Sequence, residues 1–363
     1  MRVIGLMSGS SLDGIDLAAC HFSQDENEIW HYTLAHSECI PLPETWINRL
    51  RNLPAQSAYI FWKTHVYFGH YLGDLVRHFN QKQQFNAELV GSHGHTIFHF
   101  PSQRLTAQIG DGAALACNSR LPVVCDLRSG DIAKGGQGAP IVPIADLHLF
   151  ADYTFCLNLG GIANISVKTT SVQYFPAFDI CACNALLNRF AQKMGADYDD
   201  KGNIAASGQI NPMLLESLNQ IDYYQQDFPK SLGNDWVQKL GDFIAENFSE
   251  IAPEDILRTL CEHIAIQIAA AITQVKQKFP LTASKSQQML VTGGGAFNTF
   301  LTARIQAKSP DIPLHIPDDS IVKYKEAIAM AFMACLRWQG NENILASVSG
   351  APKNSIGGAI YLP

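Results

Sequence analysis

Three short polar turns in the sequence have the residue types that bind phosphate groups. They read SGSSLDG at 8–14, LGGIAN at 159–164 and TGGGAFN at 292–298, and each follows an apolar run typical of a strand. Glycine has no Cβ, so backbone N–H groups in such turns can converge on an anion. One turn of this kind is more often an ordinary hairpin. Three of them, two at β-hairpins that open successive domains, predict a nucleotide held between two related domains.

The turns differ from the two commonest phosphate-binding motifs. None contains the GK[ST] of a P-loop, and no GxGxxG follows the first predicted strand. The sequence therefore excludes a P-loop NTPase and disfavours a dinucleotide-dependent dehydrogenase.

Asp179 is the candidate general base. It follows the apolar run YFPAF at 174–178 and precedes a tight loop and a helix. Partial burial would raise the pKa of this carboxyl group and suit it to accept a proton. Asp13, Asp111 and Asp126 also lie at turns or strand ends, where an acid is usually a turn or capping residue. Asp13 lies inside the first turn and is a candidate ligand of Mg²⁺, which prefers one or two carboxylates plus phosphate oxygens.

Other polar residues give weaker signals. In GSHGHT at 91–96, Thr96 is a candidate hydrogen-bond donor to a substrate, and two His residues without a third ligand disfavour a metal site. Arg128 and Lys134 can pair with a phosphate or a substrate carboxylate, although solvated loop charge is an equal interpretation. Glu326 opens the last long helix, where an acid complements the helix dipole or contacts a substrate.

Cys181 and Cys183 form a CxC pair in a segment that we expect to be a polar loop. Such a pair is either redox-active or metal-binding, or it consists of buried reduced thiols. The sequence has nine Cys residues and neither a CxxC…CxxC array nor HExxH, which favours the reduced thiols.

The elements that position these residues alternate between strand and helix. Predicted strands at 3–7 and 15–20 flank the first turn as a hairpin. Predicted helices at 58–79 and 111–118 follow, and 122–126 is a predicted buried strand. This alternation predicts the α/β class.

A loop rich in Gly and Pro at 127–143 suggests a domain boundary. We place an N-terminal domain at 1–128 and a C-terminal domain at 129–363, whose last segment can pack back on the first domain. The second domain begins with predicted strands at 153–159 and 165–167 around LGGIAN, which repeats the architecture at the start of the chain.

The amino-acid composition and charge argue against several other classes of protein. The 363 residues are 47 % apolar and 16 % charged, which argues against intrinsic disorder. A net charge of −7 without a block of like charge makes a nucleic-acid partner improbable. No run of 18 apolar residues predicts a membrane span, and the N-terminus lacks the features of a secretory signal. We therefore expect a cytoplasmic protein with a small-molecule substrate.

Over nearly its whole length the sequence resembles the anhydro-N-acetylmuramic acid kinase family. The motifs that carry the resemblance are, in order, GLMSGSSLDGID, GSHGHT, QIGDG, GGQGAPIVP, LNLGGIAN, FD…N, YDDKGNIAASG, TGGGAFN and KEAIAMAF. The resemblance implies two related α/β domains of the actin/hexokinase/chaperone ATPase type with a nucleotide cleft between them. It also implies ATP, Mg²⁺ and a homodimer. The implied reaction opens the 1,6-anhydro ring with water and phosphorylates O6, giving N-acetylmuramic acid 6-phosphate and ADP, in bacterial cell-wall recycling.

The resemblance also assigns roles by position. It makes Asp179 the general base, and Thr96, Asn184 and Glu326 contacts of the sugar. The implied ATP contacts are Gly9, Ser10, Ser11, Leu12, Asp13, Gly14, Ile15, Asp16, Gly160, Gly161, Gly293, Gly294, Gly295 and Asn298.

The sequence departs from the family pattern at three places. Ser10 replaces a Thr and His95 replaces a Gln. The larger change is FDICACN at 178–184, where the familiar pattern is FDTGPGN. The Asp and the Asn are retained, but the shape of the loop is left open, and the two thiols would make the site sensitive to oxidation.

Three alternatives remain at this point. In the first, the protein is a kinase for another amino sugar. In the second, it is a non-catalytic ATP switch of the actin or chaperone type. In the third, it is a thiol-regulated or metal protein built on the CxC pair.

Overall fold

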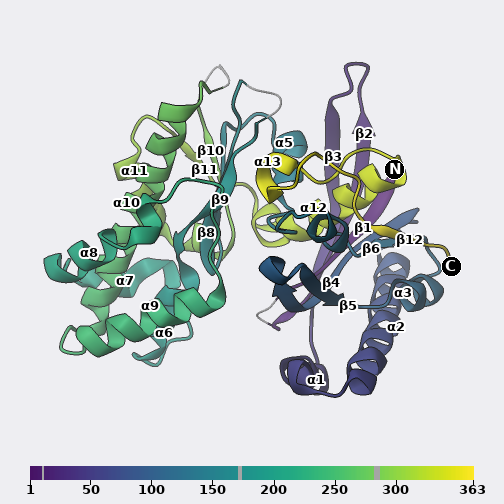
Figure 1. Cartoon of the computed structure of the whole chain (residues 1–363), viewed down its shortest axis with the longest axis horizontal. Helices are drawn as coiled ribbons and strands as arrows, with labels where there is room; N and C mark the ends of the chain where they lie inside the picture. The colour runs from purple at the N-terminus through teal and green to yellow at the C-terminus, as the bar shows by residue number, and fades with distance from the viewer. Residues whose placement is uncertain (10–11, 171–173, 282–286) are drawn as a thin grey trace. The chain divides into compact units, whose positions relative to one another are not determined.

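A computed structural model describes residues 1–9, 12–170, 174–281 and 287–363 (Figure 1). The chain forms two compact units. Unit 1 contains Met1–Leu149 and Tyr324–Pro363, and unit 2 contains Phe150–Lys323. Each unit has its own β-sheet with helices packed on it, so the predicted α/β class with two sheets is confirmed.

The sheet of unit 1 has the strand order β12-β6-β4-β1-β2-β3, and β5 pairs with β4. Strand β1 is antiparallel to β2 and parallel to β4. The strands are β1 (Arg2–Ser8), β2 (Gly14–Gln24), β3 (Trp30–Pro41), β4 (Leu89–Phe100), β5 (Leu105–Ile109), β6 (Val123–Cys125) and β12 (Ala359–Tyr361). The first hairpin and the strands around it therefore form as the sequence predicts.

Alternating side chains of β1 and β2 reach two separate cores, because successive residues of a strand point to opposite faces. Ile4 and Leu6 pack with helices α2 and α3, whereas Val3 packs with α12. The helices of unit 1 are α1 (Glu44–Asn52), η1 (Leu53–Ala55), α2 (Ala58–Gln83), η2 (Pro101–Gln103), α3 (Gly112–Ser119), α4 (Ser129–Ala133), α5 (Pro143–Leu149), α12 (Asp319–Trp338, from Tyr324 onward) and α13 (Ala346–Ser349).

The boundary between the units differs from the predicted division into 1–128 and 129–363. Helices α4 and α5 belong to unit 1, because Ile141 and Ile144 are buried with α12. The Gly- and Pro-rich loop is held in place by the Asp131 carboxylate, which accepts hydrogen bonds from the Gly138 N–H (2.7 Å) and the Ser349 hydroxyl (2.8 Å). The C-terminal segment returns to unit 1, where β12 pairs with β6.

The sheet of unit 2 has the order β11-β10-β7-β8-β9. Strands β7, β8 and β9 are successively antiparallel, and β10 is parallel to both β7 and β11. Unit 1 has the same order and orientations in β6-β4-β1-β2-β3, so the two units are topologically related. The strands are β7 (Phe155–Leu159), β8 (Ile162–Val167), β9 (Ala177–Ala182), β10 (Met289–Thr292) and β11 (Leu314–His315).

Helix α10 is the main core helix of unit 2. By length and composition it is apolar enough to cross a membrane, but 72 % of its most apolar 18-residue stretch is buried inside the protein. Burial of that extent is what a core helix shows. The helices of unit 2 are α6 (Asn184–Gln192), η3 (Asp200–Gly202), α7 (Asn203–Ser207), α8 (Pro212–Asn219), η4 (Asp222–Gln225), α9 (Asn234–Asn247), α10 (Pro253–Lys278), η5 (Gly294–Phe297) and α11 (Thr299–Lys308).

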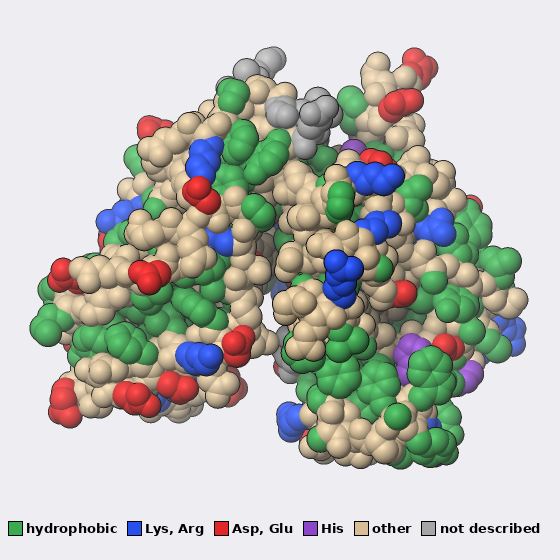
Figure 2. Space-filling model, in the orientation of Figure 1, with side chains coloured by type: hydrophobic (Ala, Val, Ile, Leu, Met, Phe, Trp, Pro, Cys, Tyr) green, Lys and Arg blue, Asp and Glu red, His purple; other side chains and the backbone are tan. Residues whose placement is uncertain are grey.

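On the face shown in Figure 2, Lys and Arg side chains are interspersed with Asp and Glu side chains. This face has the dispersed charge expected from 26 basic and 33 acidic residues without long runs of one sign.

Helix α12 approaches β1 closely at Gly5, and this approach gives a test of the packing. A Cβ at Gly5 would overlap the carbonyl group of Ala327, so we expect Gly5→Ala to destabilise the protein by about 1–3 kcal/mol or to prevent folding. Urea denaturation measures the effect. Gly130→Ala is the matched control, since a Cβ there meets no atom within 4 Å. Equal midpoints for the two variants would contradict the close approach.

Candidate active site

Asp179 lies on β9 and is held by the segment at 223–232. Its backbone N–H donates to the Lys230 carbonyl (3.1 Å), and its own carbonyl accepts a hydrogen bond from the Tyr223 hydroxyl (2.7 Å). One carboxylate oxygen accepts from the Leu232 N–H (2.9 Å). Burial raises the pKa of Asp179 to about 6, and the Leu232 hydrogen bond opposes part of that rise. The carboxylate is thus both fixed in orientation and able to exchange a proton near neutral pH.

The residues after Asp179 form regular structure instead of the polar loop that the sequence analysis expects. Cys181 lies in β9 and pairs with Ala163 of β8, and α6 begins at Asn184. Both Cys181 and Cys183 are fully buried, and burial raises the pKa of Cys183 to about 12 and that of Cys181 well above its ordinary value. Such thiols are not nucleophiles at neutral pH. Within the described residues no group of three or more His, Cys, Asp or Glu side chains is placed to hold a metal ion.

The second and third glycine turns meet in unit 2, next to Asn184. The Asn184 side-chain amide donates to the Leu159 carbonyl (2.8 Å), and its backbone N–H donates to the Gly160 carbonyl (3.0 Å). Gly293 adopts φ of +80°, and a Cβ there would overlap the Leu159 backbone. The two turns and the start of α6 therefore form one packed unit, and glycine is required for the contact.

A cavity of about 400 Å³ opens beside these turns within unit 2. It is lined by four segments that are distant in sequence, which include the predicted residues Asn184, Gly294, Gly295 and Asn298. The Asn298 side chain also caps α11 by accepting from the Leu301 N–H (2.9 Å), so its amide N–H groups are the ones left to contact a ligand.

Several other residues of this cavity were not predicted from the sequence. Lys323 lies over the Phe297 ring, 5.6 Å from its centroid, and gives the cavity a cation. Asp199 is buried and accepts from two N–H groups of α7, which fixes the YDDKGN segment. The YDDKGN motif was the one sequence feature that could have indicated these residues. The additional lining residues are Leu187, Asn188, Tyr198, Asp199, Asp200, Lys201, Phe297, Asp319 and Lys323.

The first glycine turn lies in unit 1. Ser10 and Ser11 lie outside the described residues. Leu12 has φ of +63°, and its N–H donates to the Gly9 carbonyl (3.3 Å). Gly14 and Ile15 belong to β2, and Ile15 is buried in the core, so only its backbone can meet a ligand at this end.

Two carboxylates lie together at this turn. Asp13 is exposed, and Asp16 is half-buried on β2. Burial raises the pKa of Asp16, the Asp13 carboxylate adds to the rise, and a hydrogen bond with the Cys39 thiol opposes it. A divalent cation between the two carboxylates would relieve their repulsion, so the donor set fits Mg²⁺.

A second polar group in unit 1 centres on Arg128. Its Nε donates to His93 Nε2 (2.9 Å), and its Nη1 donates to the Gly138 carbonyl (2.5 Å). Burial lowers the pKa of His93 to about 3, so the ring is neutral, and its Nδ1–H donates to the Gly94 carbonyl (3.0 Å). His95 instead pairs with the Ser8 hydroxyl (3.0 Å). The two His residues therefore position other groups and share no metal ion.

Glu326 and Thr96 belong to the same unit. The Glu326 side chain reaches solvent, yet the protein around it desolvates the carboxyl group and raises its pKa, an effect that Arg128 opposes. The Thr96 hydroxyl accepts a hydrogen bond from Gln108 Nε2 (3.3 Å), which leaves its own hydrogen free to donate. Lys134 is exposed, in keeping with a solvated loop charge.

Comparison with known proteins places the chain in a family. The family model described as "Anhydro-N-acetylmuramic acid kinase" matches residues 1–363. A protein of that name from Vibrio cholerae is 33 % identical, with 99 % of this chain and 98 % of that protein aligned. One from Haemophilus influenzae is 32 % identical over 99 % and 97 %. The chain belongs to the anhydro-N-acetylmuramic acid kinase family.

Solved structures give weaker likenesses to this member of the kinase family. They include the activator of the 2-hydroxyisocaproyl-CoA dehydratase from Clostridium difficile, with 14 % identity, a TM-score of 0.43 and coverage of 92 % and 94 %. An inorganic polyphosphate/ATP-glucomannokinase from an Arthrobacter strain has 12 % identity, a TM-score of 0.37 and coverage of 93 % and 99 %. Likenesses at this level carry no argument about function.

The raised pKa of Asp179 predicts an effect on stability. Above pH 6 the folded state holds a desolvated carboxylate, which costs folding free energy. The cost disappears as pH falls through 6 toward the ordinary value of 3.8. We therefore expect Asp179→Asn of this family member to be more stable than wild type by about 2 kcal/mol at pH 8, after allowance for partial solvent access, and by less at pH 4.

Urea denaturation at the two pH values measures this difference. Asp222→Asn replaces an exposed carboxylate in the same unit and is the matched control. If Asp179→Asn and the control show the same pH dependence, the carboxyl group of Asp179 is not desolvated.

Proposed function

We propose that this kinase transfers the γ-phosphoryl group of ATP to O6 of 1,6-anhydro-N-acetylmuramic acid while water opens the anhydro ring. The product is N-acetylmuramic acid 6-phosphate, and the reaction serves recycling of the cell-wall sugar. The observation that carries the proposal is Asp179, a fixed carboxylate with a pKa of about 6 in a chain that belongs to the family along its whole length. The homodimer and the cytoplasmic location stay predictions.

Asp179 would act on the water. The carboxylate accepts a proton as the water oxygen bonds to C1, and the C1–O6 bond breaks. The O6 electron pair attacks the γ-phosphorus, and the bond to the β-phosphate oxygen breaks, releasing ADP. Charges balance because the proton stays on Asp179 until it is released to solvent. A pKa of about 6 keeps most of this carboxyl group ionised at neutral pH and still basic enough to accept the proton.

The cavity beside the two turns of unit 2 supports a nucleotide site. Its size suits a nucleoside, the Phe297 ring offers an apolar face, and Lys323 offers a cation. The first turn in unit 1 would contact the phosphates. The proposed ATP contacts are Gly9, Ser10, Ser11, Leu12, Asp13, Gly14, Ile15, Asp16, Gly160, Gly161, Gly293, Gly294, Gly295 and Asn298.

Asp13 and Asp16 are the residues we propose to hold Mg²⁺. Bound there with phosphate oxygens, the ion would neutralise charge on the transferring phosphoryl group. Burial is the main cause of the raised pKa of Asp16, and the smaller contribution of the Asp13 carboxylate supports this assignment.

The sugar would contact Thr96, Asn184 and Glu326, with Arg128 as the partner of its carboxylate. Arg128 is already positioned by His93 and by the Gly138 carbonyl, so little side-chain entropy is lost on binding. Its positive charge also matches the single negative charge of a muramic acid.

Asp179→Asn tests the role of the base. We expect sugar-dependent ATP turnover to fall by about 10²–10⁴-fold while ATP affinity is retained, because amide nitrogen cannot accept the proton. In wild type, kcat/KM should fall tenfold per pH unit below pH 6. A coupled ADP assay and calorimetric titration with ATP measure these quantities, with Asp222→Asn as the control.

The same assay separates the alternatives. Phosphosugar formed only from the anhydro sugar supports the proposal, whereas product from N-acetylglucosamine alone indicates a different amino-sugar kinase. ATP hydrolysis that is independent of sugar, and unchanged in Asp179→Asn, indicates an ATP switch. Sugar-dependent turnover that persists in Asp179→Asn would remove Asp179 as the base.

Arg128→Lys tests recognition of the substrate carboxylate. A lysine cannot reproduce the planar, multiply bonded guanidinium, so we expect KM for the anhydromuramic sugar to rise about tenfold with kcat changed less. The corresponding anhydro-N-acetylglucosamine lacks the carboxylate and serves as the control substrate. An equal rise in KM for both sugars would contradict the assigned contact.

A further inference from the structure

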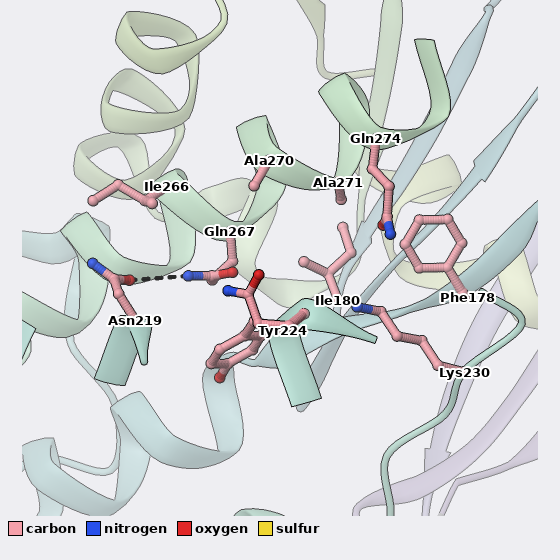
Figure 3. Close-up of a pocket in the computed structure, with 11 residues that line it drawn as sticks. Phe178, Ile180, Asn219, Tyr224, Lys230, Ile266, Gln267, Ala270, Ala271 and Gln274 are labelled. Atoms are coloured by element: carbon pink, nitrogen blue, oxygen red, sulfur yellow. Dashed lines mark hydrogen bonds between the residues drawn. The ribbon is translucent and has the colours of Figure 1, made fainter. Parts of the chain in front are cut away.

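Unit 2 contains a second cavity of about 400 Å³, which is lined in part by β9 (Figure 3). Phe178 and Ile180 of β9 line it, whereas Asp179, which lies between them, is not among its lining residues. The rest of the wall comes from α10, the end of α8, η4 and Lys230. None of its lining residues also lines the cavity beside the glycine turns.

A buried His263 fixes the polar part of this wall. Burial lowers the pKa of His263 to about 3, so the ring is neutral and has one N–H. The Asn219 Oδ1 is an acceptor, so His263 Nδ1–H donates to it (2.8 Å) and His263 Nε2 accepts from the Tyr224 hydroxyl (3.0 Å). Gln267 Nε2 donates to the same Asn219 oxygen (2.9 Å). The Gln267 amide is therefore oriented with its nitrogen toward Asn219 and its oxygen toward the cavity (Figure 3).

A second acceptor and a cation face the same space. Gln274 Nε2 donates to Asp227 Oδ1 (2.9 Å), which leaves Gln274 Oε1 as the group available to a ligand. The Lys230 ammonium donates to the carbonyls of Tyr223 (3.2 Å) and Gln226 (3.0 Å), and one of its three N–H groups remains. Figure 3 shows the ends of Gln267, Gln274 and Lys230 turned toward the region around Ile180.

These groups define the chemistry of a ligand. Lys230 is the one cation among the lining residues, so it matches one negative charge, as on a carboxylate. The carboxamide oxygens of Gln267 and Gln274 accept hydrogen bonds and therefore require N–H or ammonium groups on the ligand. Gln267 is more than nine-tenths buried, and its bond to Asn219 fixes the amide, so little side-chain freedom would be lost when a ligand binds.

We propose that this cavity is a binding site for a small zwitterion, a free amino acid or a short peptide. The carboxylate contacts Lys230, and the ammonium or amide N–H groups contact Gln267 and Gln274. Ile180, Ala270 and Ala271 form the apolar side and favour a small aliphatic side chain. Partial burial lowers the pKa of Lys230, and the Asp227 carboxylate opposes part of that fall. A bound carboxylate would offset more of the cost of burial.

The site is connected to the candidate base by backbone. Lys230 is two residues from Leu232, whose N–H holds the Asp179 carboxylate, and the Lys230 carbonyl accepts from the Asp179 N–H. A ligand on Lys230 is therefore expected to change the environment of the Leu232 amide. This amide gives a signal that does not depend on kinase activity.

Titration of the full-length protein with L-alanine and with L-alanyl-L-alanine tests the proposal. Calorimetry measures affinity, and the ¹H–¹⁵N signal of Leu232 reports the site. We expect saturable binding of at least one probe with a shift of that signal, and at least tenfold weaker binding of propionate, which lacks the N–H donors. The probe that binds with the higher affinity shows whether the site prefers an amino acid or a peptide.

Ala270→Trp supplies the matched variant, because Ala270 is an exposed lining residue of α10 and a Trp side chain there would fill the cavity. Thr273→Trp adds the same bulk at an exposed position of α10 outside the lining. We expect at least a tenfold loss of affinity in Ala270→Trp and none in Thr273→Trp. Absence of binding by both probes, equal binding of propionate, or equal binding to both variants would overturn the proposal. ATP and sugar are absent from this experiment, so its outcome is independent of the proposed kinase reaction.

Discussion

The desolvation of the Asp179 carboxylate is the constraint on which the chemistry of unit 2 depends. A buried carboxylate without partners would be expelled to solvent or stay protonated over the working pH range. Here β9 supplies the position, and one backbone N–H from the segment at 223–232 compensates part of the cost. That balance leaves the pKa close to neutrality. The same segment hydrogen bonds to both backbone groups of Asp179, so the orientation of the carboxylate and its basicity have a common origin.

The relation between the two sheets explains why polar turns recur in the chain. In each unit a strand runs into a glycine turn and returns antiparallel, and a later strand joins parallel to the first. The turn at the end of the first strand is the position where side chains are small and backbone N–H groups are accessible. A repeated topology therefore places similar turns at corresponding ends of two sheets, although their sequences differ.

Local patterns predicted much of this arrangement. The fold class, the opening hairpin and the strands next to the glycine turns follow from short apolar runs and glycines. The partial burial of Asp179 follows from its place after such a run, and its role as the base stays a prediction. The first compact unit continues to Leu149, beyond the expected boundary at 128, because Ile141 and Ile144 pack in the core that α12 completes. Cys181 and Cys183 were expected in a polar loop, but Cys181 pairs with β8, Cys183 directly precedes α6, and both are buried. Both differences concern partners that are distant in sequence, which composition cannot reveal.

The cavity beside the glycine turns illustrates the same limit. Tyr198 and Lys201 share the YDDKGN segment, but Lys323 is far from it in sequence, and only the fold brings all three to one wall. The role of His263 is equally hidden, since a single His in an apolar helix gives no sequence signal. Its neutral ring orients Asn219 through a hydrogen bond that no spacing rule anticipates.

Unit 1 consists of two segments that are separated in the sequence by unit 2, and this affects the order in which the units can fold during synthesis. Residues 150–323 are synthesised before the segment that supplies α12 and β12, and those elements contribute a core and an edge strand to unit 1. On the ribosome, unit 2 therefore has its whole sequence available while unit 1 still exposes the apolar face that α12 will cover. The unit that starts first is the one completed last, and its exposed face would be the part of the nascent chain that most needs protection from aggregation.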